Sequence, residues 1–185
     1  LQASYTDFHY LRPEWKQSCD EDALLGIGLT GVADGVIFSF DLFQAAKVSV
    51  EENKRVAQLI GINSSARITT IKPSGTLSSV MGCASGIHAR HSPYYIRRIR
   101  LLKNELVYNY FRQCLPEFIE DEYFDPENQA VLSLPIKSPE TSLFRSESPI
   151  DLCNRVKKVY KEWILPGHIR GEFTHNVSST ISIKD

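Results

Sequence analysis

The sequence contains no long hydrophobic run. Nowhere in its 185 residues does a stretch approach the roughly 20 apolar residues that a membrane-spanning helix requires. The N-terminal residues 1–5 also lack the basic and apolar regions of a secretory signal peptide. These absences predict a cytoplasmic protein with no membrane partner.

Closely spaced cysteines are missing as well. The four cysteines are widely scattered and form no Cys-x-x-Cys pair; they are Cys19, Cys83, Cys114 and Cys153. Such spacing argues against a zinc site and against a disulfide framework. We therefore expect no metal site, and we expect most of the thiols to be reduced and structural.

A strong net charge is the third absence, because 21 basic and 22 acidic residues give the chain a formal net charge of −1. With 42% hydrophobic residues, this balance indicates a packed domain and not a disordered chain. The positive charge is unevenly distributed, because Glu105 is the only acidic residue between Arg67 and Arg112. Basic residues therefore gather around the middle of the chain.

Predicted helices and strands alternate along the chain. The apolar periodicity predicts helices over 50–60, 77–83, 104–114 and 151–164, and strands over 66–71, 94–101, 130–136 and 177–185. Such alternation predicts an α/β fold with a largely parallel sheet covered by helices, either open or closed as a barrel. We expect one domain or part of one, because the sequence starts without a methionine and its last strand needs a neighbour.

The first third of the chain is less regular. The acidic run Asp20–Asp22 is typical of a solvated helix start. Gly26, Gly28 and Gly31 match the Gly-x-Gly-x-x-Gly spacing, but no acidic residue about 20 positions further on completes a dinucleotide-binding unit. Close packing of a buried element is the better interpretation of these glycines.

The most informative stretch is Lys72–Ser79, which follows the apolar run 68–71 and precedes a predicted helix. Pro73 fixes its backbone angle, Gly75 lets a ligand approach closely, and the free N–H groups of a first helical turn favour an anion. The same residues are also typical of an ordinary turn with a helix cap. The surrounding positive charge favours anion binding, and ligands gather at the carboxyl ends of strands in such sheets.

Other polar residues near this stretch have two interpretations. His88, Arg90 and His91 are candidates for a supporting role beside a polyphosphate, although histidines before a strand more often bond to the backbone. The tyrosines and arginines that follow are typical of a nucleic-acid surface, but alternation in a half-buried strand explains them equally; they are Tyr94, Tyr95, Arg97, Arg98 and Arg100. His175 and Asn176 are left unassigned.

Four motifs carry a resemblance to a known family. The run Ile71–Thr76, followed by Ala84–Arg98, closely resembles the large catalytic chain of ribonucleotide reductase, specifically its adenosylcobalamin-dependent class, class II. The glycine-rich stretch Leu25–Asp34 and the segment Thr174–Ser178 are similar to flanking motifs of these enzymes. The resemblance spans essentially the whole chain.

The resemblance implies a fold and an activity. The family fold is a ten-stranded α/β barrel of two half-barrels, and residues 1–185 would be a single partial domain forming most of the C-terminal half. The implied reaction replaces the ribose 2′-hydroxyl of a ribonucleotide by hydrogen, with adenosylcobalamin starting the radical and a pair of thiols supplying electrons. The family's radical cysteine lies in an Asn-x-Cys-x-Glu motif that this sequence lacks, so no catalytic residue is expected here.

The resemblance also implies what the chain binds. Backbone N–H groups and hydroxyls of the 72–79 loop would hold the substrate phosphates, at Pro73, Ser74, Gly75, Thr76, Leu77 and Ser78. The implied partners are the nucleotide substrate, the N-terminal half with the radical cysteine and a dithiol reductant such as thioredoxin, with a homodimer left open. The alternative is a stand-alone module that binds nucleotides or RNA without catalysis.

Overall fold

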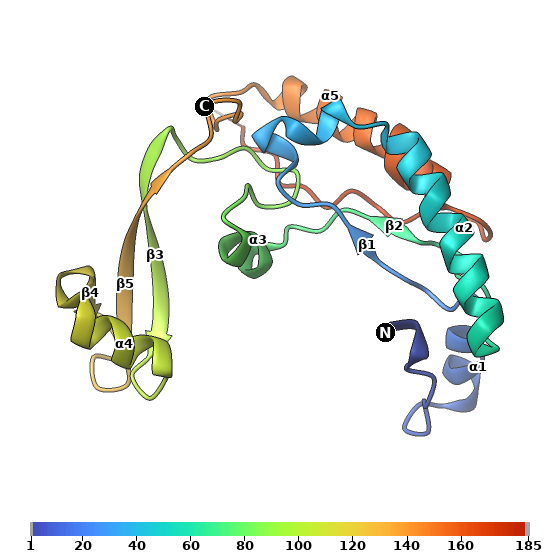
Figure 1. Ribbon diagram of the computed structural model, residues 1–185, viewed down its shortest axis with the longest axis horizontal. Helices are drawn as coiled ribbons and strands as arrows, with labels where there is room; N and C mark the ends of the chain where they lie inside the picture. The colour runs from blue at the N-terminus through green and yellow to red at the C-terminus, as the bar shows by residue number, and fades with distance from the viewer. Residues whose placement is uncertain (1, 184–185) are drawn as a thin grey trace. The chain divides into compact units, whose positions relative to one another are not determined.

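The computed structural model describes residues 2–183, which form two compact units. The first unit contains residues up to Arg90 together with those from Thr141 onward, and the second unit is His91–Glu140 (Figure 1). Within the described chain, no helix combines the length and the apolar character needed to cross a membrane.

The longest helix of the first unit is α2 (Leu42–Ile60). It begins at Asp41, whose side chain accepts a hydrogen bond from the Gln44 N–H at 2.9 Å, and it ends at Gly61 in the left-handed conformation. The predicted stop at Gly61 is confirmed, but the helix begins eight residues before the predicted start at 50.

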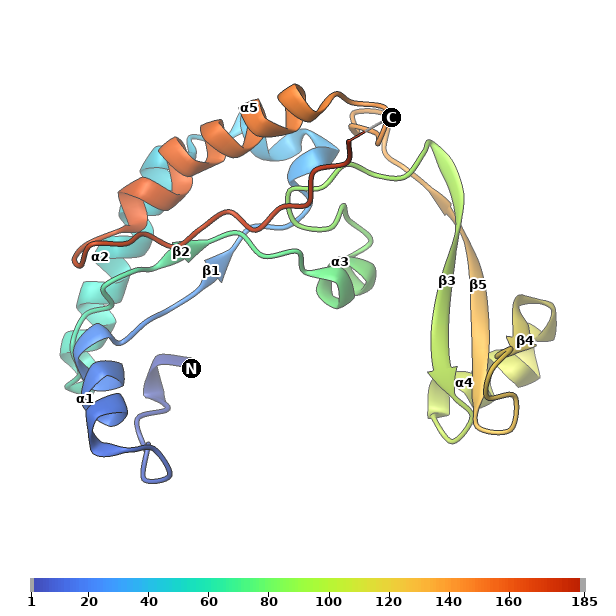
Figure 2. The same cartoon turned by 180° about the vertical axis from the view of Figure 1, so that it is seen from behind.

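The second long helix of this unit is α5 (Pro149–Val159), which lies beside α2 in both ribbon views (Figures 1 and 2). A reciprocal capping box between Ser148 and Asp151 fixes its start. The chain continues past α5 as a π-helical turn (Tyr160–Ile164), which packs against α2. The predicted helix over 151–164 is confirmed, with an irregular last turn.

A two-stranded parallel sheet carries the candidate loop. It consists of β1 (Ile27–Gly28) and β2 (Thr69–Thr70). Single bridges from Arg67 to His168 and from Ile71 to Val177 continue the extended chain around β2. The predicted strand over 66–71 is confirmed in position, with regular pairing over a shorter range.

The core of the first unit joins the helices to β2. Trp163 Nε1 donates a hydrogen bond to the Thr70 carbonyl at 3.2 Å, and Thr69 Oγ1 donates to the Trp163 carbonyl at 2.6 Å. The buried members of this cluster are Val32, Ala46, Ile71, Ile87, Leu152, Val159, Trp163 and Ile164. The strand that leads into the loop is therefore fixed from the helical side.

The predicted C-terminal strand over 177–185 is wrong for the residues that the structure describes. Among residues 177–183 only Val177 forms a β-bridge, to Ile71, and the Ser178 N–H donates to the Ile71 carbonyl at 3.1 Å; the chain then continues past β2 (Figure 2). The pairing ends there because the backbone that follows β2 changes direction at Lys72. Pro73 also has no N–H that could donate the next hydrogen bond of the pairing. Residues 184 and 185 lie outside the described part.

The N-terminal helix also differs from the prediction. α1 (Pro13–Asp22) ends at the acidic run Asp20–Asp22 and does not begin there, because Pro13 supplies the helix start and Ala23 adopts a left-handed conformation at its end. Gly31 supports the close-packing interpretation, since an added Cβ would lie 3.1 Å from Cys83 Cβ. The prediction of a buried element is wrong for Gly26 and Gly28, which are exposed. Short 3₁₀ turns complete this unit at Gln2–Ser4, Val32–Asp34, Val36–Ser39 and Leu165–Gly167.

The second unit is an antiparallel sheet with one helix. Its elements are β3 (Tyr94–Leu102), α4 (Leu106–Cys114), a 3₁₀ turn (Pro116–Phe118), β4 (Ile119–Asp121) and β5 (Gln129–Lys137). The strand order is β3-β5-β4 and both pairings are antiparallel, so the prediction of a largely parallel sheet is wrong here. β4 was not predicted; residues 122–128 join it to β5, and a connection this short fits an antiparallel pair, since parallel strands need a crossover of a dozen or more residues. Ile119, Ala130 and Leu132 form the buried core.

Candidate phosphate-binding site

The 72–79 loop joins β2 to the short helix α3 (Gly75–Met81). Ser74 precedes the helix with a φ of 51°, a left-handed conformation that is uncommon for residues other than glycine. Its carbonyl accepts the Ser78 N–H at 2.9 Å. The N–H groups of Gly75, Thr76 and Leu77 precede this bond, and such groups have no partner within their own helix.

The start of α3 is open. Gly75, Thr76 and Leu77 are exposed, and apart from its chain neighbours and its own helix backbone no described atom lies within 4 Å of a Cβ added at Gly75. Within the described chain, the Ser74 side chain makes no capping hydrogen bond to the helix. The loop therefore combines exposed residues with the uncapped start of a helix, which is the arrangement that an anion requires.

The six predicted phosphate-binding residues differ in their exposure to solvent. Pro73, Gly75, Thr76 and Leu77 are exposed, whereas Ser74 is half-buried. Ser78 is fully buried, and its hydroxyl donates to the Gly75 carbonyl at 3.1 Å. The Ser78 side chain thus supports the turn and does not point toward a ligand.

A segment behind the loop holds it in place. Ser85 Oγ donates to the Pro73 carbonyl. Gly86, with a φ of 55°, lies directly against the Lys72 carbonyl, so that an added Cβ would overlap it. Thr30 fixes this segment in turn, because its hydroxyl donates to the Ala84 carbonyl at 3.1 Å and accepts from the Gly86 N–H at 3.1 Å.

Asp34 and Arg90 form a buried ion pair behind the same segment. Arg90 Nε donates to Asp34 Oδ1 at 2.6 Å, and Arg90 Nη2 donates to Asp34 Oδ2 at 3.1 Å. The carboxylate also accepts from the Ala84 N–H at 2.8 Å and from Ser142 Oγ at 3.0 Å. Burial alone would raise the pKa of Asp34, but the hydrogen bonds from Arg90, Ala84 and Ser142 and the charge of Arg90 lower it overall.

The pKa of Asp34 predicts a pH dependence. A folded-state pKa below the unfolded value of about 3.9 means that the Asp34 contribution to stability is complete above that value and is lost as pH falls through the folded-state pKa. We expect the unfolding free energy of the chain to fall less steeply between pH 5 and pH 3 in Asp34→Asn than in the unsubstituted chain. Urea unfolding at several pH values measures this, and equal slopes would contradict it.

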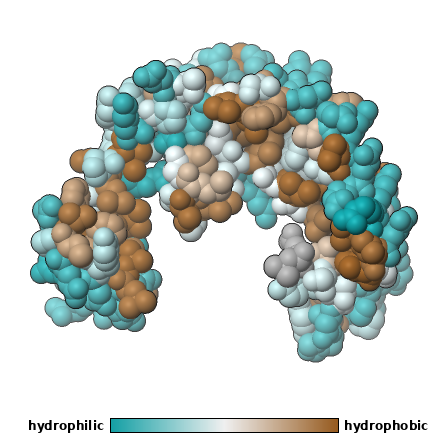
Figure 3. All heavy atoms as spheres, viewed as in Figure 1, coloured by the Kyte–Doolittle hydropathy of each residue, from teal (hydrophilic) through white to brown (hydrophobic). Residues whose placement is uncertain are grey.

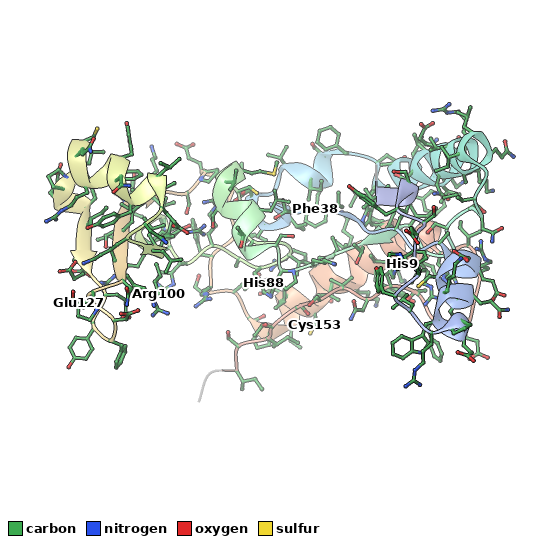
Figure 4. All side chains as sticks on the ribbon, turned by 90° about the horizontal axis from the view of Figure 1, so that it is seen from below. His9, Phe38, His88, Arg100, Glu127 and Cys153 are labelled. Carbon is green, nitrogen blue, oxygen red and sulfur yellow. The ribbon has the colours of Figure 1, made fainter. Side chains whose placement is uncertain are left out.

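The three basic candidates have different partners. Arg90 is only 5% exposed and directs its guanidinium to Asp34 and to the Gly82 carbonyl. His88, labelled in Figure 4, bonds through Nδ1 to the Ser85 carbonyl at 3.2 Å and through Nε2 to the Thr180 N–H at 2.8 Å. His91 belongs to the second unit, where its ring meets Tyr95 edge-on.

Sequence reasoning missed Thr30, Asp34 and Ser142 as supporting residues. The one available signal was the position of Asp34 at the end of the glycine-rich motif. Nothing in the spacing could connect Asp34 with Ser142, which lies 108 positions away. His175 bonds through Nδ1 to the Thr69 carbonyl at 3.0 Å.

The basic strand of the second unit is paired with acidic residues. Arg98 pairs with Glu120, Arg100 Nη2 lies 3.3 Å from Glu122 Oε1, and Lys103 Nζ lies 2.6 Å from Asp121 Oδ1. Over residues 91–140 there are six basic and eight acidic residues, a formal net charge of −2 with neutral histidines. This arrangement argues against an RNA-binding surface on β3, because counterion release requires unneutralised positive charge.

The structure also locates the cysteines. All four are free; Cys19, Cys114 and Cys153 are exposed and Cys83 is partly buried. Within residues 2–183, no group of three or more His, Cys, Asp or Glu side chains could hold a metal ion.

No protein-family model matches this chain. A Dictyostelium discoideum protein described as a probable adenosylcobalamin-dependent ribonucleoside-triphosphate reductase is 30% identical over 126 residues, covering 62% of this chain and 16% of that protein. The Lactobacillus delbrueckii subsp. bulgaricus adenosylcobalamin-dependent ribonucleoside-triphosphate reductase is 30% identical over 95 residues, covering 51% of this chain and 13% of that enzyme. The chain thus spans about a sixth or less of these curated relatives.

A solved structure shares the fold. The crystal structure of a B12-dependent, class II ribonucleotide reductase superposes with a TM-score of 0.70 and 20% identity, over 90% of this chain and 27% of that one. Its match shows that the fold of this chain is shared with part of that enzyme. The resemblance seen in the motifs is therefore confirmed by sequence and by fold: this chain is similar to part of the adenosylcobalamin-dependent, class II, ribonucleotide reductases.

Proposed function

We propose that this chain is part of an adenosylcobalamin-dependent ribonucleotide reductase and that its 72–79 loop binds the substrate phosphates. The observation that carries the proposal is the open start of α3, where Gly75, Thr76 and Leu77 are exposed and the Ser74 side chain makes no capping hydrogen bond. The positive end of the helix dipole and the exposed Lys72 add positive charge at the same place. An extended phosphate chain matches these donors.

The proposed role includes a place in the family barrel. We infer that residues 1–185 form one partial domain, the C-terminal half of the ten-stranded barrel. α3 supports this inference, because Leu77, Val80 and Met81 are 54%, 82% and 64% exposed, and its surface carries apolar side chains in Figure 3. Exposed apolar surface of this kind marks interaction sites, and the N-terminal half with the radical cysteine is the proposed partner.

The proposed reaction is the reduction of ribonucleotides to deoxyribonucleotides for DNA synthesis, in the cytoplasm, with a dithiol such as thioredoxin as reductant. Adenosylcobalamin would generate the radical when bound to the complete enzyme. The depression lined by Tyr5, Phe8, Cys19 and Leu24 has a volume of about 680 Å³, which is in the range of drug-sized ligands and below that of a corrinoid, so this depression is not assigned to the cofactor. The proposed role of this chain is to bind and orient the substrate phosphates. Its four cysteines are assigned no radical role.

The phosphate assignment predicts the effect of a charge at Gly75. In Gly75→Glu we expect the affinity for a nucleoside triphosphate to fall by at least about tenfold, or about 1.4 kcal/mol, because a carboxylate would repel the phosphates and fill their space. Calorimetric titration measures this loss in binding. Reductase activity after combination with the proposed N-terminal half measures its consequence.

The same position offers its own control. Because an added Cβ at Gly75 meets no described atom within 4 Å, the substitution should leave the unfolding free energy unchanged. Gly75→Gln has nearly the same volume without the charge, so the difference between the two variants isolates the electrostatic part. Unchanged affinity in Gly75→Glu would rule out the phosphate assignment.

A further inference from the structure

The geometry of the 72–79 loop is set from outside the loop. β2 is only two residues long and α3 only seven, so neither element is long enough to fix the turn between them. The contacts that hold the turn come from the segment 82–86, through the Ser85 hydroxyl on the Pro73 carbonyl and the close approach of Gly86 to the Lys72 carbonyl. Whatever fixes this segment therefore fixes the loop.

Two charged side chains hold this segment at its start and in its middle. Arg90 Nη2 donates to the Gly82 carbonyl at 2.8 Å, and Asp34 Oδ2 accepts from the Ala84 N–H at 2.8 Å. The two side chains bond each other, with 4% of Arg90 and 12% of Asp34 exposed. A bidentate arginine–carboxylate pair has a defined geometry, so it holds Gly82 and Ala84 at a fixed separation.

The pair has no means of binding a ligand directly. The Nε and Nη2 groups of Arg90 are engaged by Asp34 and by Gly82, and the positive charge of the guanidinium is balanced by the carboxylate beside it. Burial removes both side chains from any surface that a phosphate could reach. Their effect on the loop must pass through the backbone of residues 82–86.

We propose that Asp34 and Arg90 are positioning residues for the phosphate-binding loop, which set the direction of its backbone donors through the segment 82–86. The role assigned to the pair in phosphate binding rests on the proposed function. The contacts that link the pair to the loop do not depend on that function. Losing either charge would leave the other buried and uncompensated, so the segment 82–86 would relax and the loop with it.

A matched control for this pair exists in the same unit. Arg155 bonds Glu147 in a bidentate pair of similar burial, with Nη1 to Oε2 at 2.6 Å and Nη2 to Oε1 at 2.7 Å. Arg155 Nε donates to the Ile87 carbonyl, one residue beyond the segment that contacts the loop. Glu147→Gln therefore removes a buried charge of the same kind without touching residues 82–86.

The test measures amide hydrogen exchange in the Asp34→Asn and Glu147→Gln variants of this chain. The temperature of each measurement is chosen so that the two variants have the same unfolding free energy. We expect the amides of residues 75–79 to exchange at least about tenfold faster in Asp34→Asn than in Glu147→Gln. Equal exchange at these amides in the two variants would overturn the inference. If Asp34→Asn fails to fold, the double variant Asp34→Asn/Arg90→Gln removes both charges, and loop exchange equal to that of Glu147→Gln would again overturn it.

Nucleotide binding separates the inference from the proposed function. We expect Asp34→Asn to weaken binding of ATP by about tenfold or more and to leave binding of adenosine, which has no phosphates, unchanged. Faster loop exchange with unchanged ATP affinity in both Asp34→Asn and Gly75→Glu would support the mechanical link and reject the phosphate site. Weakened ATP affinity in Gly75→Glu alone would support the phosphate site and overturn the role of Asp34.

Discussion

Gly86→Ala is expected to destabilise the chain by about 3 kcal/mol or more, as measured by urea unfolding. The backbone at Gly86 has a φ of 55°, where residues with a Cβ lose about 1–2 kcal/mol. The added Cβ would also overlap the Lys72 carbonyl and lie 3.2 Å from Pro73 Cα, so backbone and not a flexible side chain must move. Overpacking of this kind costs a further 1–3 kcal/mol, roughly.

Gly61→Ala is the matched control for this prediction. Gly61 has a similar φ of 72°, but a Cβ there meets no described atom within 4 Å. We expect it to lose only the conformational part, about 1–2 kcal/mol. Equal losses in the two variants would mean that the contact between Gly86 and Lys72 does not hold the loop.

Trp163→Ala is expected to lose about 3–5 kcal/mol of unfolding free energy, the usual cost of removing a large aromatic side chain from a core. Trp163 is 3% exposed and packs in the cluster that joins α2 and α5 to β2. Its removal also takes away the indole donor of the Thr70 carbonyl. Because Thr70 lies two residues before Lys72, the loss should also raise the hydrogen exchange of the loop.

Trp15→Ala supplies the comparison. Trp15 lies on α1 and is 61% exposed, with the Arg12 guanidinium 5.9 Å from the centre of its ring. We expect its replacement to change the unfolding free energy by no more than about 0.5 kcal/mol. A loss in Trp163→Ala as small as this would contradict the assigned core. Calorimetry or chemical unfolding of both variants decides the point.

Local signals explain which elements could be predicted. Gly61 ends α2 as expected, because a glycine after an apolar face is a direct stop signal. The start of α2 was also encoded, by Asp41 as a cap with Gln44 three residues later, but the exposed Val48 and Phe43 obscured the periodicity before residue 50.

No local sequence signal showed whether neighbouring strands run parallel or antiparallel. A period of two residues places β3 and β5 correctly, but it is the same for parallel and antiparallel pairing. The alternating burial of β3 is in fact typical of an antiparallel sheet with one solvated face. β4, with three residues, is too short to produce a periodic pattern.

The candidate site likewise contains residues that the sequence could identify and residues that it could not. The loop residues are contiguous, so their chemistry and their resemblance to a family could be read from one short stretch. The residues that hold the loop come from three distant segments, around Thr30, Arg90 and Ser142, and only folding brings them together. Whether the loop binds phosphate stays a prediction, which Gly75→Glu tests.

The π-helical turn at Tyr160–Ile164 makes this part of the chain sensitive to length. Wider turns of this kind accommodate one more residue than an α-helix, and here the turn brings the Trp163 carbonyl to the Thr69 hydroxyl. Deleting one residue would restore a regular α-helix here and would withdraw the Trp163 carbonyl from the Thr69 hydroxyl. Related sequences should therefore keep the number of residues between α5 and Gly167 constant even where the residues themselves change.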